Sequence, residues 1–388
     1  MFNCMMTKEL DLIYQELAYN LALKGKISCY PNPAVGCLIV KEGQIISLGY
    51  HKFAGTAHAE RDAVEKLQQA YPDTWQEKIA HAHVYVTLEP CAHYGRTPPC
   101  ANLLADCKVA KVTYLSADTT DKVNGKGVKI LREAGVEVEF VPWQQCLNLN
   151  KDFFALQAQA DLPFIKVKIG ASLDSKIALP NGNSKWITSL QAREYVQALR
   201  WQSDAILTSA KTLIIDQAKY NVRYEQLPQE VKNYLAVKDL KQPKVVIFDN
   251  SFLLTGQEEI FKHHQSQNLI IVSQKEHPLA NKIPELNFVV GYNSHQKQDL
   301  EKILQILKQE YALANVLVET GSSLTNFFLE QKLFSQLHYF MAPKILGSGV
   351  QALATQEKFT QLEQCLTLNL LYQINLNEDN LYLVYEQK

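Results

Sequence analysis

The chain has 388 residues, of which 47% are hydrophobic and 20% are charged. This length exceeds that of a usual single domain, so we expect two domains with apolar cores. The formal net charge of −1 argues against a broad surface for nucleic acid or anionic membrane. No segment has the apolar length of a membrane span, and residues 1–10 lack the apolar core of a signal peptide, which predicts a cytoplasmic protein with free cysteines.

The pattern of residues 1–146 predicts a mixed sheet with helices on both faces. Apolar residues recur at helical spacing through residues 10–23, and two apolar runs at 35–40 and 44–48 flank a turn, as in a β-hairpin. Helices are then expected at 58–70, 98–107 and 126–134, and strands at 83–88, 111–115 and 136–140. A hairpin followed by such alternation is typical of a layered α/β domain.

The second predicted domain covers residues 147–388 and is again of the α/β class. A helix at 147–160 is expected to lead into it, with a break at 161–163. Strands are expected at 164–169, 204–208, 244–248, 269–272, 288–290, 315–319, 338–341 and 382–385, and helices at 189–200, 299–311 and 322–331. The polar segments 226–241 and 251–266 are expected to be rich in loops.

Four residues at strand-to-helix junctions of the first domain predict a metal site. His58 and Glu60 open one predicted helix, Cys91 follows a predicted strand, and Cys100 begins the next helix. One imidazole and two thiolates supply three ligands for a tetrahedral zinc ion and leave one position open for water. Glu60 lies two residues beyond His58, so it can act as a proton shuttle without being a ligand. His-x-Glu followed by a Pro-Cys-x-x-Cys pair is the signature of zinc deaminases, although eight residues separate the two cysteines here.

Two other interpretations of these residues are open. The first is another imidazole ligand, namely His51, His81, His83 or His93, but only His58 is paired with a glutamate. The second is a chance grouping of a histidine and two unrelated core cysteines. The ordered placement of all the members at junctions favours a metal site.

Short motifs extend the pattern through the chain in a fixed order. In the first half they are residues 30–37 (YPNPAVGC), 49–55 (GYHKFAG), 58–60 (HAE) and 87–100 (TLEPCAHYGRTPPC). In the second half they are residues 168–176 (KIGASLDSK), 184–189 (SKWITS), 318–321 (VETG) and 342–347 (APKILG). Together they resemble the bifunctional deaminase/reductase family of bacterial riboflavin biosynthesis. The long segment between the two cysteines separates this family from cytidine and tRNA adenosine deaminases.

The resemblance implies a cytidine-deaminase-like first domain and a second domain similar to dihydrofolate reductase. The first would hydrolyse the 2-amino group of a phosphoribosylated diaminopyrimidinone, and the second would use NADPH to reduce the ribosyl group of that product to ribityl. The partners implied are therefore small molecules, with no nucleic acid and no membrane, and a homo-oligomer stays open.

The resemblance also implies site residues. Those implied for the deaminase substrate are Asn32, His51 and His93. Those implied for the reductase substrate are Ser184, Arg200, Tyr220, Arg223 and Glu319. Those implied for NADPH are Gly170, Trp186, Thr212, Asp216, Asn250, Gly321, Ser322 and Ser323.

The residues of the second half support a ligand site on their own terms. Polar residues gather after several predicted strands, and open α/β sheets bind ligands beyond the carboxyl ends of their strands. The segment 321–323 between a strand and a helix suits anion binding through backbone N–H groups, with ordinary serine capping of the helix as the alternative. No Gly-x-Gly-x-x-Gly motif is present, so a Rossmann dinucleotide site is not supported. Asp174 and Lys176 are candidate proton donors for the reduction.

Some positions depart from the family pattern. Ala34, Ala57 and the turn 118–121 alter loops near the deaminase site without touching a metal ligand. The segment 216–223 keeps Asp216 and Arg223 but lacks a proline and a second acid between them. This loss motivates one alternative function, a monofunctional zinc deaminase with an impaired reductase domain. An alternative from another class is a zinc-stabilised binding module without turnover.

Overall fold

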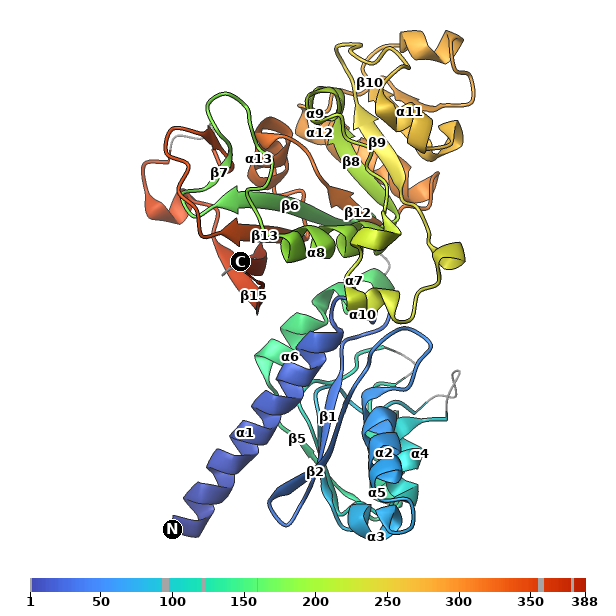
Figure 1. The fold of residues 1–388 in the computed structure, drawn as a ribbon, viewed down its shortest axis with the longest axis vertical. Helices are drawn as coiled ribbons and strands as arrows, with labels where there is room; N and C mark the ends of the chain where they lie inside the picture. Colours follow the sequence, from blue (N-terminus) through green and yellow to red (C-terminus); the bar gives the residue numbers. More distant parts are fainter. Residues whose placement is uncertain (1, 93–97, 121–122, 159, 355–358, 378–379) are drawn as a thin grey trace. The chain divides into compact units, whose positions relative to one another are not determined.

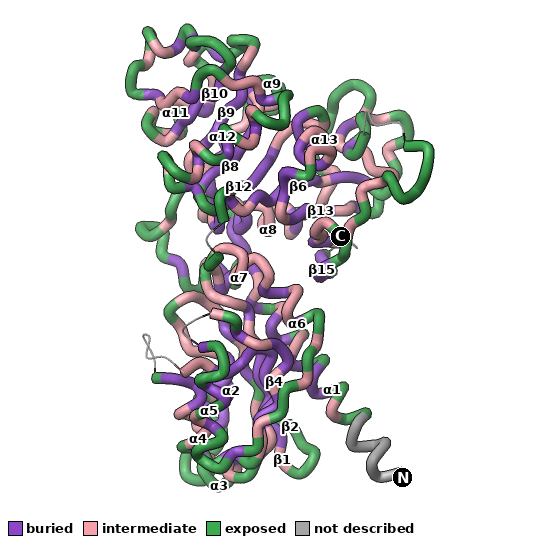
Figure 2. The backbone as a smooth tube through the Cα atoms, turned by 180° about the vertical axis from the view of Figure 1, so that it is seen from behind, coloured by how far each residue is buried: buried purple, intermediate pink, exposed green. Residues whose placement is uncertain are grey.

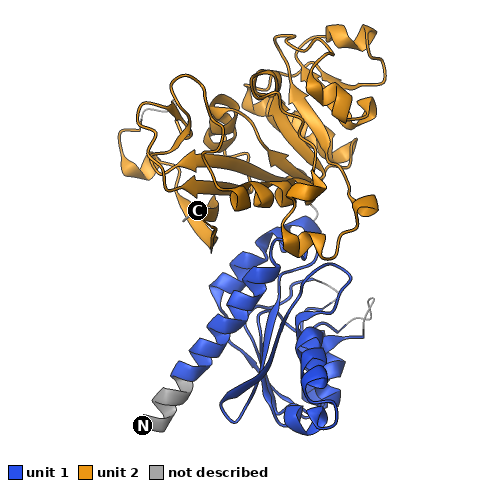
Figure 3. Ribbon diagram, in the orientation of Figure 1, with its two compact units in different colours: residues 1–158 blue, residues 159–388 orange. Residues whose placement is uncertain are grey.

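The computed structural model describes residues 2–92, 98–120, 123–158, 160–354, 359–377 and 380–388. These residues form two compact units, one ending at Ala158 and the other beginning at Gln159 (Figure 3). Both units are α/β, as the sequence predicts. No helix in the described part of the chain is both long enough and apolar enough to span a membrane.

The segment before this boundary differs from its predicted form. The sequence predicts one helix at 147–160 in the second domain, whereas the chain forms α6 (Gln144–Leu149) and α7 (Lys151–Gln157), separated at Asn150. The Asn150 side chain accepts a hydrogen bond from the Ala34 N–H at 2.8 Å and donates one to the Ala34 carbonyl at 2.9 Å. These bonds tie the helices to unit 1, and the units divide after residue 158 rather than after residue 146.

Unit 1 is built around one mixed sheet (Figure 1). Its strands are β1 (Gly36–Lys41), β2 (Gln44–Tyr50), β3 (His83–Val86), β4 (Lys111–Tyr114) and β5 (Glu137–Phe140). They lie in the order β2-β1-β3-β4-β5; β1 is antiparallel to both neighbours, and β3, β4 and β5 are parallel. The remaining helices are α1 (Phe2–Gly25), α2 (Ala59–Ala70), α3 (Trp75–Ile79), α4 (Cys100–Asp106) and α5 (Lys126–Glu133).

Side chains that alternate along β1 build a core on each face of this sheet. Cys37 and Ile39 join the cluster formed with α2, α4 and α5. Leu38 and Val40 pack in a second cluster with Tyr14, Ala18 and Leu21 of α1. The sheet is thus the middle of three layers, with α1 on one face and α2, α4 and α5 on the other (Figure 1).

Unit 2 is also built around a mixed sheet. Its strands are β6 (Phe164–Ser172), β8 (Ala205–Ser209), β9 (Lys244–Phe248), β10 (Leu269–Ser273), β11 (Asn287–Val290), β12 (Asn315–Val318), β13 (Gln336–Ala342), β15 (Leu368–Asn375) and β16 (Leu381–Gln387). They lie in the order β11-β10-β9-β8-β12-β6-β13-β16-β15. Neighbours from β11 to β13 are parallel, while β16 is antiparallel to β13 and β15.

Helices cover the parallel part of this sheet. They are α8 (Leu190–Trp201), α9 (Ala210–Asp216), α10 (Gln229–Lys232), α11 (Glu259–His263), α12 (Lys297–Gln309) and α13 (Ser322–Glu330). The central strands are buried on both faces (Figure 2): Leu207 of β8 joins one core cluster and Ile206 joins another. A separate ribbon pairs β7 (Lys176–Ala178) with β14 (Val350–Gln351), two strands that the sequence analysis does not predict.

Candidate active sites

The predicted zinc ligands meet at one point in unit 1. His58 is the N-cap residue of α2, Cys91 follows the end of β3, and Cys100 is the first residue of α4. One ligand atom from each lies within 4.8 Å of the others, and among the described residues this is the only cluster of its kind. The structure thus brings together three residues that are spread over 43 positions of sequence, counted from 58 to 100.

The spacing of these atoms fits a tetrahedral zinc ion. His58 Nδ1 lies 3.5 Å from Cys91 Sγ and 3.5 Å from Cys100 Sγ. Zinc bonds of about 2.3 Å to sulfur and about 2.0–2.1 Å to nitrogen, at tetrahedral angles, place such atoms roughly 3.5 Å apart. The Cys100 N–H donates to Cys91 Sγ at 3.3 Å, and hydrogen bonds from the Cys100 thiol and the His58 ring lower the pKa of the Cys91 thiol. The donor set and its geometry both suit zinc.

Glu60 lies in the same cavity as His58 and Cys91 and is only 3% exposed. In the metal-free chain, burial and the neighbouring Cys91 thiolate raise the pKa of the Glu60 carboxyl to about 7. A carboxyl group with a pKa near neutrality is suited to accept and return a proton.

His51 is held as a neutral imidazole beside the ligands. Its Nδ1 lies 3.0 Å from the Ala57 carbonyl, so this nitrogen carries the hydrogen and donates it. Its Nε2 then accepts a hydrogen bond from the Asn32 side-chain amide at 3.0 Å. Burial lowers the pKa of His51 to about 4. The His51 ring packs edge-on against His58 with a centroid distance of 5.3 Å, so Asn32 and His51 form one polar wall of the cavity.

The cavity has a volume of about 940 Å³ and includes residues to which the sequence analysis assigns no role in a site. They are Leu88, Glu89, Asp118, Phe153, Phe154 and Gln157. Glu89 is buried and accepts a hydrogen bond from the Gly125 N–H at 2.9 Å, which fixes the turn before α5. Phe153 and Phe154 belong to none of the sequence motifs, so only their position on the helix after Asn150 could have predicted their place in the cavity wall.

The other candidate histidines are placed differently. His83 lies on β3, and its Nε2 is 2.8 Å from Thr113 Oγ1. His81 is exposed and has a positive φ of 63°. His93, predicted to contact the deaminase substrate, lies outside the described residues.

A buried ion pair forms the centre of a second site, in unit 2. Arg200, near the end of α8, makes two hydrogen bonds to the Glu319 carboxylate, at 2.6 and 3.0 Å, and Lys168 Nζ lies 3.4 Å from the same group. Burial alone would raise the pKa of Glu319, but the charges of Arg200 and Lys168 outweigh it and lower this pKa to about 2. Lys168, Arg200, Arg223 and Glu319 line one cavity of about 310 Å³.

Tyr220 lines none of the cavities described here, although the resemblance implies that it contacts substrate. Its side chain is 4% exposed, and its hydroxyl lies 2.8 Å from Thr208 Oγ1 and donates to the Glu319 carbonyl at 3.2 Å. Tyr220 therefore supports the backbone at Glu319 from within the core. Asp174 and Lys176 also lie outside the cavity walls: Asp174 accepts hydrogen bonds from the backbone at 346–347, and Lys176 contacts Gln351.

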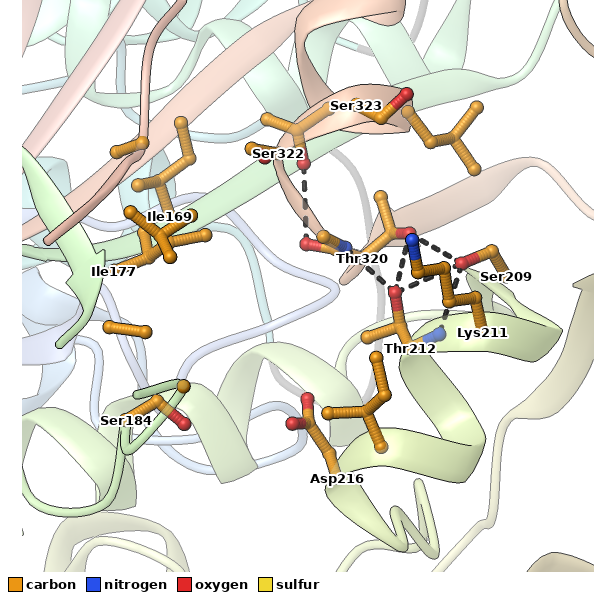
Figure 4. A pocket seen from close by; sticks show the side chains of 18 of the residues that line it. Ile169, Ile177, Ser184, Ser209, Lys211, Thr212, Asp216, Thr320, Ser322 and Ser323 are labelled. Atoms are coloured by element: carbon orange, nitrogen blue, oxygen red, sulfur yellow. Dashed lines mark hydrogen bonds between the residues drawn. The ribbon is translucent and has the colours of Figure 1, made fainter. Parts of the chain in front are cut away.

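A larger cavity of about 1140 Å³ opens at the carboxyl ends of the parallel strands. It contains every residue predicted for NADPH, namely Gly170, Trp186, Thr212, Asp216, Asn250, Gly321, Ser322 and Ser323. Ser184, predicted for substrate, also lines it. Figure 4 shows Ser209, Thr212 and Thr320 pointing toward one another on its wall, with hydroxyl separations of 2.9–3.4 Å.

The glycine at 321 fits closely against this wall. Its N–H donates to Thr212 Oγ1 at 2.9 Å, and a Cβ at this position would lie 3.2 Å from the same oxygen. The wall therefore leaves little room for a side chain where α13 begins. Lys168 and Arg193 line both this cavity and that of the ion pair, so the two cavities adjoin. The sequence analysis misses both residues, although a lysine inside a predicted buried strand was a signal for Lys168.

The altered segment after α9 is anchored by a hydrogen-bonded pair. Val222 donates its N–H to the Gln242 side chain at 2.7 Å and accepts from the same amide at 2.9 Å. The Arg223 N–H donates to Gln197 at 3.0 Å. These bonds keep Arg223 at the ion-pair cavity despite the lost proline.

Comparisons with known proteins agree with this division. Residues 8–116 match the family model described as the cytidine and deoxycytidylate deaminase zinc-binding region, and residues 163–381 match the RibD C-terminal domain. The riboflavin biosynthesis protein RibD of Haemophilus influenzae is 36% identical over 97% of this chain and 98% of its own length. The corresponding Escherichia coli protein is 36% identical over 89% and 91%.

Solved structures show the same likeness along the whole chain. RibD of Acinetobacter baumannii has a TM-score of 0.65 and 34% identity, covering 98% of this chain and 99% of its own. A diaminohydroxyphosphoribosylaminopyrimidine deaminase/5-amino-6-(5-phosphoribosylamino)uracil reductase of Thermotoga maritima has a TM-score of 0.64 and 27% identity over the same shares.

The fold and the two sites define a bifunctional enzyme, with a zinc-binding deaminase domain followed by a reductase domain. This class replaces the alternative of a binding module without turnover. The chain belongs to the RibD family of riboflavin biosynthesis proteins, and it carries out two consecutive steps of that pathway on a small-molecule substrate. Nothing in the comparisons supports a monofunctional deaminase.

Proposed function

We propose that unit 1 deaminates a diaminohydroxyphosphoribosylaminopyrimidine and that unit 2 reduces the ribosyl side chain of the resulting 5-amino-6-(5-phosphoribosylamino)uracil. The names of the relatives that match the whole chain support these substrates. The observation that carries the proposal is the His58, Cys91 and Cys100 cluster, with Glu60 in the same cavity. Its donor set and 3.5 Å spacing suit zinc.

His58, Cys91 and Cys100 would hold the zinc ion. When bound, zinc supplies a Lewis acid that makes water a stronger nucleophile near neutral pH. The Glu60 carboxylate takes a proton from the attacking water and delivers it to the departing amine, so one water is consumed and one ammonia is released. Asn32, held by its hydrogen bond to the neutral His51, supplies hydrogen-bonding groups at the cavity wall that orient the pyrimidine.

NADPH is the proposed reductant of unit 2. The larger cavity would bind it through Thr212, Asn250 and the backbone at 321–323, and when bound it supplies a hydride. The N-terminal end of α13 begins at this wall and favours a negatively charged phosphate. The adjoining cavity would hold the substrate, with Arg223 available for its phosphate because Arg200 is already paired with Glu319.

One preparation can test both halves of this proposal. Ammonia release, NADPH oxidation and bound zinc are measured together on the full chain. Exchange of Glu60 for Gln should abolish ammonia release while zinc stays bound, and the Cys91→Ser variant should lose tight zinc binding. Retention of one tightly bound zinc by Cys91→Ser would show that the ligand set is wrong. An absence of NADPH-dependent turnover on the deaminated intermediate would reject the reductase half.

Light scattering of the purified chain tests whether the protein forms a homo-oligomer. Fractionation of the source cells tests whether it is cytoplasmic.

A further inference from the structure

The short helix α7 forms part of the wall of the deaminase cavity. Phe153, Phe154 and Gln157 line this cavity together with His58 and Glu60. No residue of α7 is fully buried, and both phenylalanines are half-buried. Their rings lie edge to face at a centroid distance of 5.2 Å. Two aromatic rings that face a polar cavity, instead of completing a core, leave apolar surface available for a planar ligand.

Two sets of contacts fix this helix in place. Asn150, at the N-cap of α7, is 1% exposed and bonds both backbone groups of Ala34, which is fully buried. Asp152 pairs with Lys26 at 2.6 Å, and their side chains are only 19% and 11% exposed. Since a buried backbone group without a partner is costly, the Asn150 contact ties α7 to the loop before β1.

The same loop carries the polar wall of the cavity. Asn32 lies two residues before Ala34 and donates to His51, which in turn bonds the carbonyl of Ala57, the neighbour of the zinc ligand His58. Asn150 thus connects two parts of the cavity wall. One part is polar and consists of Asn32 and His51, and the other is the aromatic surface of α7.

We propose that Phe153 and Phe154 form the surface on which the heterocycle of the deaminase substrate packs, and that Asn150 is a positioning residue that sets this surface relative to Asn32. This inference rests on the proposed assignment of the zinc cavity as the deaminase site. Stacking of a nucleobase on an aromatic side chain contributes about 1–3 kcal/mol by alanine substitution, which corresponds to roughly 5- to 150-fold in affinity. The aromatic surface therefore acts on substrate binding and leaves the proton transfers at Glu60 unchanged.

The test compares alanine variants of α7 in the full-length, zinc-loaded enzyme. Phe153→Ala and Phe154→Ala should each raise the KM for ammonia release by roughly tenfold, with kcat within about twofold of the unchanged enzyme. Leu156→Ala is the matched control, because Leu156 lies on the same helix but does not line the cavity. An unchanged KM in both phenylalanine variants, with zinc content and NADPH oxidation intact, would overturn the proposal.

A double variant tests the positioning role. If Asn150 acts through the aromatic surface, Asn150→Ala should raise KM. In the Phe154→Ala background, the same exchange should raise KM by a smaller factor than it does alone. Fully additive effects would reject this role. Asn150→Asp keeps the acceptor for the Ala34 N–H, so its KM should lie between those of the unchanged enzyme and Asn150→Ala. This variant supplies the same test if Asn150→Ala loses zinc. Activity of the Glu60→Gln variant would instead reject the proposed function, independently of α7.

Discussion

Removal of Arg200 from the buried pair with Glu319 gives a quantitative test of the electrostatics of unit 2. The two side chains are 12% and 5% exposed, and Arg200→Met leaves the carboxylate with Lys168 at 3.4 Å as its remaining ion-pair partner. Removing one member of a buried ion pair lowers the free energy of unfolding by about 3–5 kcal/mol. The pKa of Glu319 gives a second figure, for desolvation and both cations together: a carboxyl whose pKa is 4.5 unfolded and about 2 folded contributes about 3 kcal/mol at pH 7.

The pH dependence of this loss has a definite sign. The folded pKa of Glu319 lies below its unfolded value, so its contribution to stability is fully present above pH 4.5. The contribution is lost as the pH falls through that value toward about 2. At pH 3 it should have fallen to roughly 1.4 kcal/mol. If the folded pKa of Glu319 returns to its unfolded value in Arg200→Met, the charge-dependent part of the destabilisation should be about 2.4 times larger at pH 7 than at pH 3.

Urea unfolding followed by circular dichroism at the two pH values measures this difference. The Glu319→Gln variant and the double variant complete a mutant cycle that isolates the pair from each residue's other contacts. An equal loss of stability at pH 7 and pH 3 would refute the reasoning, because it would show that Arg200 stabilises unit 2 by packing and not by its charge.

Three further predictions concern packing and metal. Gly36→Ala should lower the free energy of unfolding of unit 1 by about 2 kcal/mol or more, since a Cβ would lie 2.1 Å from the Ala18 carbonyl oxygen; a thermal melt with unchanged midpoint would contradict this. Phe328→Ala, at a fully buried position in the core of unit 2, should cost about 3–5 kcal/mol in urea unfolding. Treatment with a strong zinc chelator should abolish ammonia release and spare NADPH oxidation, because the zinc ligands and the reductase cavities lie in different units; parallel loss of both activities would contradict it.

The zinc cluster was predictable because local signals mark each of its members. His58, Cys91 and Cys100 all stand at junctions between a strand and a helix, and such junctions are visible as changes in the period of apolar residues. The Arg200–Glu319 pair carries no such signal. Its members are 119 residues apart, and only the pairing of β8, β12 and β6 in one sheet brings α8 and the end of β12 together.

The extent of α7 could not be predicted for a related reason. Residues 147–160 have the apolar spacing of one helix, and nothing local distinguishes Asn150 from a solvent-exposed asparagine on that helix. The break there depends on hydrogen bonds to Ala34, which is 116 residues away in sequence. The sequence also did not predict the ribbon of β7 and β14, because its strands are short and lie far apart in the sequence.

The two sites treat their key carboxylates in opposite ways, and the difference follows from their neighbours. Glu60 and Glu319 are both buried, so desolvation alone would raise the pKa of each. Beside Glu60 lies a thiolate, which adds to the rise; beside Glu319 lie Arg200 and Lys168, which reverse it. A carboxyl group that titrates near neutral pH can both take up and release a proton. A carboxyl group that stays ionised is a fixed negative charge, and that of Glu319 holds the two cations Arg200 and Lys168 at a cavity wall.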